Sequence, residues 1–558
     1  MKRTSERGAA GAGWLVAGAV AGALLTAAVL LGGWTFARQG IPRAALPPPH
    51  FVETTATSGI DHVYDGEFTF FVGGGVAVFD CNGDGLADLY LAGGSNSAAL
   101  FVNASQVGGE LHFTEINSGA TGLVNVTGAY PLDIDADGNV DLAVLRLGEN
   151  VLLRGLGGCR FERANERWGV NGGDEWTSAF SAKWEGAASL PTLAFGNYLE
   201  LTEDGRRTGT CSDNVLYRPG DPGVYTEPVL LSPGWCTLSI LFSDWDRSGR
   251  RDLRMTNDRH YYRDGEEQLW RVATGEPARL YTHEEGWESM QIWGMGIASH
   301  DVTGDGFPEV FLTSQGDNKL QTLADGAARP AYVDIAFPRG ATAHRPFAGD
   351  VIHPSTAWHP EFQDVNNDAL IELFISKGNV EAMPDYASED PSNLLLGQAD
   401  GTFLEGAEAA GILSFARARG AALSDLNLDG LLDLVVVNRR EKVKLWMNVG
   451  SGEADDPERM GDWMAVRLHQ EGPNRDGVGS WIEVRIGRHT LRREVTVGGG
   501  HAGGQHGWIH FGLGSADGAT IRVQWPNGEH GPWIDVKANQ FLTIDRARGD
   551  AQVWTPPG

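Results

Sequence analysis

Six nine-residue segments of this chain repeat one pattern of oxygen-bearing side chains. They are DCNGDGLAD (80–88), DIDADGNVD (133–141), DWDRSGRRD (244–252), DVTGDGFPE (301–309), DVNNDALIE (364–372) and DLNLDGLLD (425–433). Oxygen ligands at positions 1, 3, 5 and 9, with a backbone carbonyl at position 7, form the ligand set that Ca²⁺ prefers, and glycine at position 6 allows the sharp turn between them. The pattern predicts structural Ca²⁺ ions, up to six in number.

The predicted metal ligands are the side chains at positions 1, 3, 5 and 9 of each segment. They are Asp80, Asn82, Asp84, Asp88, Asp133, Asp135, Asp137, Asp141, Asp244, Asp246, Ser248, Asp252, Asp301, Thr303, Asp305, Glu309, Asp364, Asn366, Asp368, Glu372, Asp425, Asn427, Asp429 and Asp433. Without a cation, such carboxylates would repel one another and raise each other's pKa. Ser248 and Thr303 are weak ligands, and Ala369 replaces the glycine of its segment. One such segment alone could be an ordinary acidic turn, but six in register favour metal binding.

The segments belong to a repeat in which an apolar strand precedes and follows each acidic loop. Between the second and third loops the interval is nearly double, and residues 179–200 keep the strand and turn character but lack the acidic ligands around 184–192. Seven units of several strands each predict an all-β fold, a seven-bladed β-propeller over residues 51–449, because a closed ring leaves few exposed sheet edges. Residues 50–64 could supply the strand that completes the last blade. An open solenoid is the alternative.

Composition limits the partners. A formal net charge of −29 excludes nucleic acid, which requires a basic surface. The four cysteines have no spacing suited to zinc. Cys211 and Cys236 could form a disulfide in an oxidising compartment, whereas nothing in the sequence pairs Cys81 with Cys159, and free thiols remain the alternative.

The N-terminus predicts a membrane anchor. Residues 9–37 contain no charged side chain and are long enough to span a bilayer as a helix, after a basic segment at 1–8 that stays in the cytoplasm. A proline-rich spacer at 38–50 follows. The bulk of the chain is therefore expected to be periplasmic or extracellular. The alternative is a signal peptide that is cleaved to release a secreted protein.

After a linker at 450–460, residues 461–546 alternate apolar and polar side chains and predict a small C-terminal β-domain, with a tail at 547–558. His501, Gln505, His506 and His510 are interpreted as exposed residues of a glycine-rich hairpin, since no acidic ligand lies at a suitable spacing. No nucleophile elbow, zinc-protease motif or P-loop is present.

Two stretches resemble known families. The strands GGGVAVFD, WGMGIASHD and ARGAALSD, with their acidic loops, resemble the FG-GAP/VCBS repeats of integrin α-subunit propellers. The segments 474–476, 493–495, 511–514 and 525–528 resemble the ASPIC/UnbV domain, which follows such repeats in cartilage acidic proteins and their bacterial relatives, although HAGGQHGW departs from the family pattern. The resemblance implies one structural Ca²⁺ for each complete loop, on one face of the propeller, and implies no catalysis.

The resulting hypothesis is a membrane-tethered, non-catalytic module outside the cytoplasm that binds or adheres to a protein or polysaccharide. The alternative is a carbohydrate-active enzyme, a lyase or hydrolase, for which Asp258 and Asp264 are the candidate carboxylate pair. Five tryptophans could line a sugar-binding face or pack between blades: Trp176, Trp184, Trp287, Trp293 and Trp358.

Overall fold

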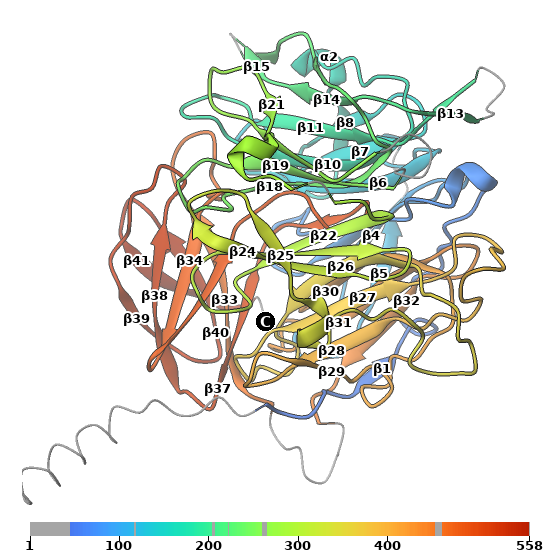
Figure 1. Cartoon of the computed structure of the whole chain (residues 1–558). Coiled ribbons are helices and arrows are strands. Elements are labelled where there is room, and N and C mark those ends of the chain that lie inside the picture. The colour runs from blue at the N-terminus through green and yellow to red at the C-terminus, as the bar shows by residue number, and fades with distance from the viewer. Residues whose placement is uncertain are drawn as a thin grey trace, which may run out of the picture.

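A computed structural model describes residues 45–116, 119–202, 207–220, 223–258, 265–288, 290–451 and 460–556. Nearly all its elements are strands, as predicted (Figure 1). Among the described residues, the exceptions are four short helices: η1 (Phe68–Phe70), α2 (Asn165–Trp168), η2 (His283–Glu285) and α4 (Ala336–Arg339). The predicted anchor at 9–37 lies outside the described residues, and no described helix is long and apolar enough to cross a membrane.

Seven sheets follow one another along residues 51–448. The first three contain β2 (Val76–Phe79), β3 (Asp88–Leu91), β4 (Ala99–Asn103) and β5 (Phe113–Ile116); β6 (Val126–Leu132), β7 (Asp141–Arg146), β8 (Val151–Gly155) and β9 (Phe161–Arg163); and β10 (Thr177–Lys183), β11 (Thr192–Asn197), β14 (Asn214–Tyr217) and β17 (Val229–Leu231). Two short hairpins, β12 (Leu199–Leu201) with β13 (Arg207–Cys211) and β15 (Pro219–Gly220) with β16 (Val224–Tyr225), extend from the third sheet.

The other four sheets repeat the same order. They contain β18 (Thr237–Ser243), β19 (Asp252–Asn257), β20 (Gln268–Arg271) and β21 (Arg279–Leu280); β22 (Gly294–His300), β23 (Glu309–Ser314), β24 (Lys319–Ala327) and β25 (Tyr332–Asp334); β26 (Ala357–Gln363), β27 (Glu372–Lys377), β28 (Asn393–Gly397) and β29 (Phe403–Glu405); and β30 (Ala418–Ser424), β31 (Asp433–Asn438) and β32 (Lys444–Asn448) with β1 (Phe51–Glu53). The strands named here are antiparallel to their neighbours, and β36 (Gly504–Gln505) adds to the first sheet in parallel with β2.

The first strand of each sheet contacts the first strand of the next, and β30 returns to contact β2. The sheets therefore surround a common centre. β1 pairs with β32, with Phe51 opposite Asn448, so the N-terminal strand completes the last sheet as predicted. This arrangement ties the two ends of residues 51–448 together.

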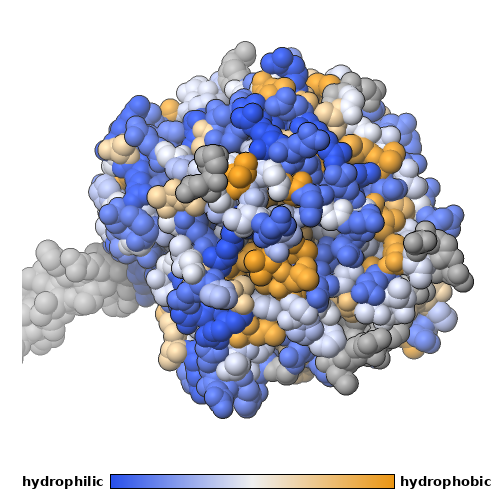
Figure 2. Space-filling view, turned by 90° about the horizontal axis from the view of Figure 1, so that it is seen from above, coloured by the Kyte–Doolittle hydropathy of each residue, from blue (hydrophilic) through white to orange (hydrophobic). Residues whose placement is uncertain are grey.

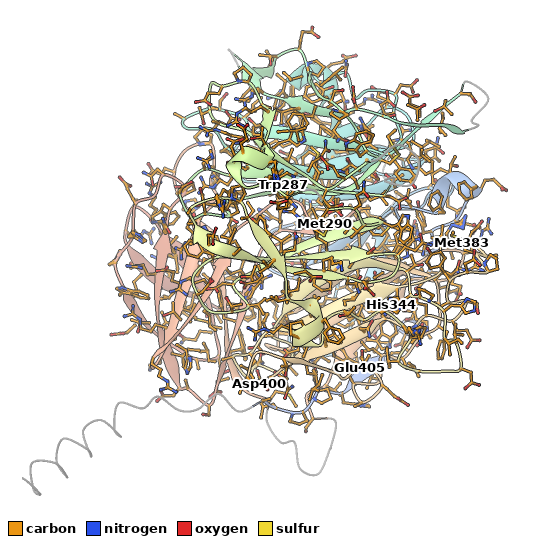
Figure 3. All side chains as sticks on the ribbon, in the orientation of Figure 1. Trp287, Met290, His344, Met383, Asp400 and Glu405 are labelled. Atoms are coloured by element: carbon orange, nitrogen blue, oxygen red, sulfur yellow. A yellow bond between two sulfur atoms is a disulfide. The ribbon has the colours of Figure 1, made fainter. Side chains whose placement is uncertain are left out.

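Apolar side chains fill the spaces between sheets. Trp287 packs with Trp245 and Tyr281 between the fourth and fifth sheets, and Met290 packs against the apolar cluster next to it (Figure 3). Trp176, Trp184, Trp287 and Trp358 are buried and Trp293 is half-buried, so these tryptophans are core residues rather than a sugar-binding face.

A separate C-terminal domain has two four-stranded sheets. One contains β33 (Asp462–His469), β37 (Ile509–Gly514), β40 (Gln540–Asp545) and β41 (Asp550–Trp554), and the other contains β34 (Trp481–Ile486), β35 (His489–Glu494), β38 (Gly518–Gln524) and β39 (Ile534–Lys537). β41 pairs with β40, so part of the predicted tail at 547–558 belongs to this domain. The predicted linker at 450–460 lies largely outside the described residues.

Two disulfides join parts of the ring. Cys211 pairs with Cys236, as the sequence allowed. Cys81 pairs with Cys159 and links the first acidic loop to the second sheet, a pairing that sequence distance did not reveal. The face seen from above is mostly hydrophilic, as the acidic composition implies, with a hydrophobic patch near the middle of the view and smaller ones elsewhere (Figure 2).

Candidate metal centres

All six acidic loops occupy the same place, between the first and second strands of a sheet. In each, the carboxylate at position 1 accepts a hydrogen bond from the backbone N–H at position 6, over 2.7–3.3 Å: Gly85 to Asp80, Gly138 to Asp133, Gly249 to Asp244, Gly306 to Asp301, Ala369 to Asp364 and Gly430 to Asp425. The sequence register therefore corresponds to one repeated loop geometry.

The backbone conformation explains the preference for glycine in these loops. Position 6 has positive φ throughout, from 66° at Ala369 to 99° at Gly306. Position 4 has positive φ as well, including 59° at Leu428. A left-handed conformation costs little for glycine and more for other residues. The Ala369 and Leu428 backbones are therefore held in conformations that the surrounding loop must stabilise.

The loop at 425–433 fits a cation best. Asp425 and Asp433 are buried, and no basic side chain of the described residues lies within 4.0 Å of Asp425, Asp429 or Asp433. Burial, together with the neighbouring carboxylates, raises the pKa of Asp433 well above its usual range. Burying several carboxylates without a cation is costly. A bound divalent cation would remove that cost.

The loop at 80–88 offers the same ligands as the loop at 425–433, and burial raises the pKa of Asp88 to about 7.

In the loop at 133–141, oxygens of Asp133, Asp135 and Asp141 all lie within 4.8 Å of one another. Buried Oδ1 atoms of Asp133 and Asp135 have no hydrogen-bond partner among the described residues. Arg154 from β8 donates to the other oxygen of Asp135 over 2.6 Å. Arg154 also pairs with Asp137, so its guanidinium neutralises two of the four predicted ligands, and the fit for a cation rests mainly on Asp133 and Asp141.

The loop at 364–372 is covered by the N-terminal segment. The Leu46 N–H donates to Asp368 over 2.7 Å, and the Asn366 side chain donates to the carbonyl oxygens of Leu46 and Pro47. The described part of the predicted spacer, residues 45–50, therefore packs on the ring beside this loop instead of standing off as a free spacer. Asp364 and Glu372 are buried, and burial raises the pKa of both well above the usual range.

The loop at 301–309 has weaker ligands and a partner from the C-terminal domain. Arg492 of β35 forms a 3.1 Å ion pair with Asp301, and the Thr303 hydroxyl donates to Glu309 over 3.0 Å. The Glu309 carboxylate is thus already partly satisfied. This loop fits a cation less well than the loops at 80–88 and 425–433.

The loop at 244–252 does not fit Ca²⁺. The guanidinium of Arg250, at position 7, lies 3.1 Å from Asp252 and 3.3 Å from Asp246, two of the predicted ligands. The Tyr281 hydroxyl also donates to Asp252 over 2.7 Å, and the Trp245 ring nitrogen does so over 3.1 Å. A fixed internal cation already neutralises these carboxylates, so a second cation between them would be repelled.

The unit without acidic ligands lies in the same register. Lys183 pairs with Thr192 across the loop, as the residues before position 1 and at position 9 do elsewhere. The buried Lys183 amine contacts the carbonyl oxygens of Arg251 and Val272 and lies 3.9 Å from Glu185. Burial lowers its pKa to about 8. The degenerate repeat predicted at 179–200 is therefore present as strands without a metal site.

The glycine-rich segment of the C-terminal domain, residues 497–505, fills the centre of the ring. Its backbone forms bridges to five sheets: Val497 with Ala182, Gly498 with Leu241, Gly500 with Ile297, Gly503 with Ala129, and Gly504 with Ala77. The His501 N–H donates to His359 Nδ1 in the sixth sheet, and Gly420 in the seventh packs against the His501 carbonyl. We call residues 497–505 the central segment.

The predicted exposed hairpin is therefore wrong. His501 and His510 are buried, and His506 is half-buried and paired with Asp476 over 3.0 Å. His501 Nδ1 lies 3.0 Å from the Met295 carbonyl, and burial lowers the pKa of His501 to about 3. Periodicity gave no signal here, because the partners of this segment lie in seven different sheets.

The candidate catalytic pair finds no support. Asp258 is buried and accepts a hydrogen bond from the Tyr198 hydroxyl over 2.5 Å. Asp264 lies outside the described residues. A buried carboxylate held by a tyrosine is not placed to act on a polysaccharide.

The fold and loops define a class of all-β repeat protein with a C-terminal β-domain. Family models identify the two parts: an FG-GAP-like repeat matches residues 80–182, and the ASPIC and UnbV domain matches residues 470–551. The chain therefore contains an FG-GAP-like repeat and a C-terminal ASPIC and UnbV domain, the two families that its motifs predicted.

More distant comparisons add little. No curated protein matches the chain. Among solved structures, the BBS1N chain of a complex with ARL6DN matches at 10% identity and a TM-score of 0.40, covering 71% of this chain and 97% of that one. A lectin from Agrocybe aegerita that recognises non-reducing terminal N-acetylglucosamine matches at 16% identity and a TM-score of 0.38, covering 68% and 92%. Similarities this weak say nothing about ligands.

Proposed function

We propose that the chain is a calcium-stabilised, seven-bladed β-propeller that acts outside the cytoplasm as a non-catalytic binding module for a protein or polysaccharide. The seven sheets serve as blades, and residues 9–37 anchor the protein in the membrane. Two disulfides support an oxidising compartment.

The observation that carries the calcium part of the proposal is the loop at 425–433. Its buried carboxylates have no basic partner among the described residues, and its backbone shape matches that of the other loops. Oxygen ligands at this spacing suit Ca²⁺ better than Mg²⁺, which requires a smaller octahedral site and retains its waters. The fit of the individual loops supports five ions rather than six, because Arg250 replaces the ion at 244–252.

The calcium loops face the C-terminal domain. Arg492 reaches Asp301, Arg475 donates to the Ala136 carbonyl, and the Gly514 N–H donates to the Asn367 carbonyl over 2.8 Å. Calcium would therefore stabilise both the propeller and the surface on which the second domain rests. Two domains held as one body provide a rigid framework for binding.

The test is to measure thermal unfolding of the full chain in mild detergent, with calcium and with a chelator, and to count bound ions by atomic emission. A ligand that binds only the native state must raise the unfolding midpoint. We expect a clear rise with about five ions bound. No rise at millimolar calcium, together with no retained ion, would remove the calcium part of the proposal.

A further inference from the structure

A large cavity lies between the propeller and the C-terminal domain, around the central segment. Its volume is about 590 Å³, and its walls come from the first acidic loop, β22, β26, β33 and the strand end at 493–497. Cavities of this size bind small organic molecules in other proteins. Main-chain groups of 498–500 and 503–505 line it and offer donors and acceptors to a polar ligand.

The acidic side chains of this cavity are occupied by donors from the protein. Glu361 accepts hydrogen bonds from the side chains of Gln363 and Gln505, each over 2.7 Å. Glu494 accepts from the Ser243 hydroxyl over 2.8 Å, and Asp476 is paired with His506. These three carboxylates have local partners and do not require a ligand. Asp80 and Asp425 also line the cavity, and in the proposed function calcium neutralises them.

Two guanidinium groups in the same cavity have donors to spare. Arg493 donates to the Gln363 side chain over 2.6 Å and to the His510 carbonyl over 3.5 Å. Arg467 donates to the Thr543 hydroxyl over 3.0 Å. Neither has a carboxylate within 4.0 Å among the described residues, whereas each guanidinium carries five N–H donors.

Both arginines are enclosed but retain accessible surface within the cavity. Enclosing a charge without a counter-ion is costly, and guanidinium groups pair best with carboxylates, in a two-point geometry. Arg467 also lies over the rings of Trp508, at 4.5 Å, and Trp554, at 5.6 Å. Aromatic rings beside a cation provide an apolar surface next to the anion-binding group.

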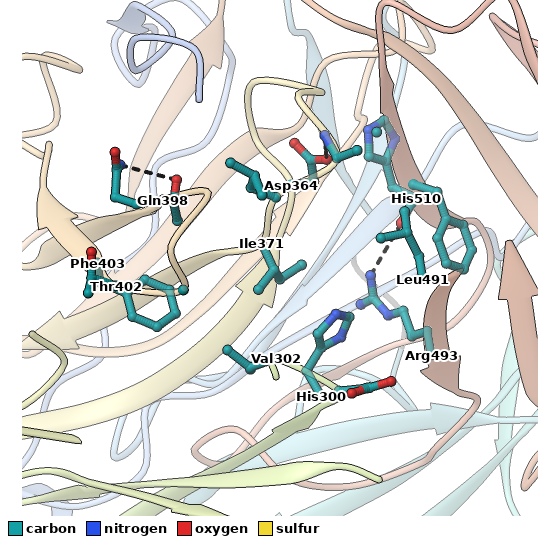
Figure 4. A pocket seen from close by; sticks show the side chains of 17 residues that line it. His300, Val302, Asp364, Ile371, Gln398, Thr402, Phe403, Leu491, Arg493 and His510 are labelled. Carbon is teal, nitrogen blue, oxygen red and sulfur yellow. Dashed lines mark hydrogen bonds between the residues drawn. The ribbon is translucent and has the colours of Figure 1, made fainter. Parts of the chain in front are cut away.

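His510 adds a polar group to the lining of the cavity. It lines the cavity and also the small pocket beside it, where Figure 4 shows it near Arg493. Its Nε2 lies 2.6 Å from Asn367 Oδ1, and its buried Nδ1 has no hydrogen-bond partner among the described residues. Because Asn367 Oδ1 is an acceptor, Nε2 carries the proton and Nδ1 is left as an acceptor.

We propose that this cavity binds the carboxylate of a sugar acid, with Arg493 and Arg467 as the anion-binding groups and Trp508 and Trp554 beside the sugar ring. The inference rests on the proposed role as a binding module and names the ligand class of that role. The same chemistry is presented by a free uronic acid and by the end of an acidic polysaccharide.

The test uses the full chain in saturating calcium, titrated calorimetrically with D-glucuronate, with glucose as the neutral probe and with digalacturonate as the chain-end probe. Glucuronate should bind and glucose should not. Tighter binding of digalacturonate would identify a polysaccharide end as the source, and equal or weaker binding would identify the free sugar acid.

Variants Arg493→Gln and Arg467→Gln should each weaken glucuronate binding at least tenfold. Arg485→Gln is the matched control, because Arg485 stacks on Trp533 outside the cavity, and it should leave the affinity unchanged. Unchanged affinity in both cavity variants, or binding of inorganic phosphate but not glucuronate, would overturn the inference. The calcium-induced rise in the unfolding midpoint reports on the proposed function separately and shows that each variant is folded.

Discussion

Replacing Arg250 with leucine should convert the loop at 244–252 from a self-neutralised loop into a calcium site. Leucine is the residue at the same position, position 7, in the loops at 80–88, 364–372 and 425–433, so the side chain is compatible with the loop shape. The prediction tests whether a guanidinium and a calcium ion perform the same task at equivalent places in the fold.

The magnitude follows from the burial of the pair. The Asp252 side chain is fully buried, whereas Arg250 is 28% exposed. Removing one partner of a fully buried pair costs about 3–5 kcal/mol. Since Arg250 is partly solvated and Asp252 keeps its bonds from Tyr281 and Trp245, we expect Arg250→Leu to lower the free energy of unfolding by about 2–3 kcal/mol in chelator.

Calcium should recover most of this loss in the variant. A ligand present at one hundred times its dissociation constant stabilises the native state by about 2.7 kcal/mol. The assay is urea unfolding of wild type and variant, with calcium and with chelator, together with an ion count. Arg329→Leu, which removes an exposed pair with Asp325, is the control and should change stability by less than about 1 kcal/mol in either buffer.

Arg250 does not replace an ion if the wild-type protein already binds six calcium ions, or if Arg250→Leu binds no more calcium than wild type. A loss of stability that is equal with and without calcium would show that Arg250 is a structural residue and does not stand in for an ion.

Three further predictions follow from separate features. Burial raises the pKa of Glu267 to about 7, so the native state keeps a proton that the unfolded chain releases above its usual pKa of 4.5. The free energy of unfolding at saturating calcium should therefore fall between pH 5 and pH 8, by at most about 3 kcal/mol. Urea unfolding should show a smaller fall for Glu267→Gln. Gly75→Ala places a Cβ 1.8 Å from the Ala502 carbonyl oxygen, so the central segment should dissociate from the ring. Limited proteolysis should then cut the C-terminal domain sooner than in wild type. Gly119→Ala is the control and should behave as wild type, because no atom lies within 4 Å of the added Cβ. Replacing Cys81 and Cys159 with serine removes a crosslink between residues 78 positions apart and should lower the free energy of unfolding by about 4 kcal/mol, measured with denaturant. A change below about 1 kcal/mol would contradict the pairing.

The sequence predicted the repeat well because the signal is local. Each acidic loop specifies its own geometry within nine residues, and its strands pair with their immediate neighbours, as in the register of Phe79 with Asp88. The degenerate third unit was predicted from the doubled interval and its strand character, and the strand that completes the last sheet from the segment before the first loop; both are present.

What the sequence could not show depends on contacts between distant segments. The central segment is held by strands of seven sheets that lie far from it in sequence, so its glycines looked like those of a free hairpin. The Cys81–Cys159 disulfide joins neighbouring sheets, and sequence separation hides that proximity. The role of Arg250 had a visible signal, since its loop alone combines arginine at position 7 with serine at position 5, but only the structure places the guanidinium between the carboxylates.

The central segment also sets the order in which the molecule can be made. The strands of all seven sheets precede residues 497–505 in the sequence and are synthesised first, so a ring that formed at that stage would lack the segment that fills its centre. Its innermost strands then present unpaired main-chain groups to any chaperone or protease nearby, until the last fifth of the chain arrives. A product that stops just after the ring would therefore lack the segment with which these inner strands pair.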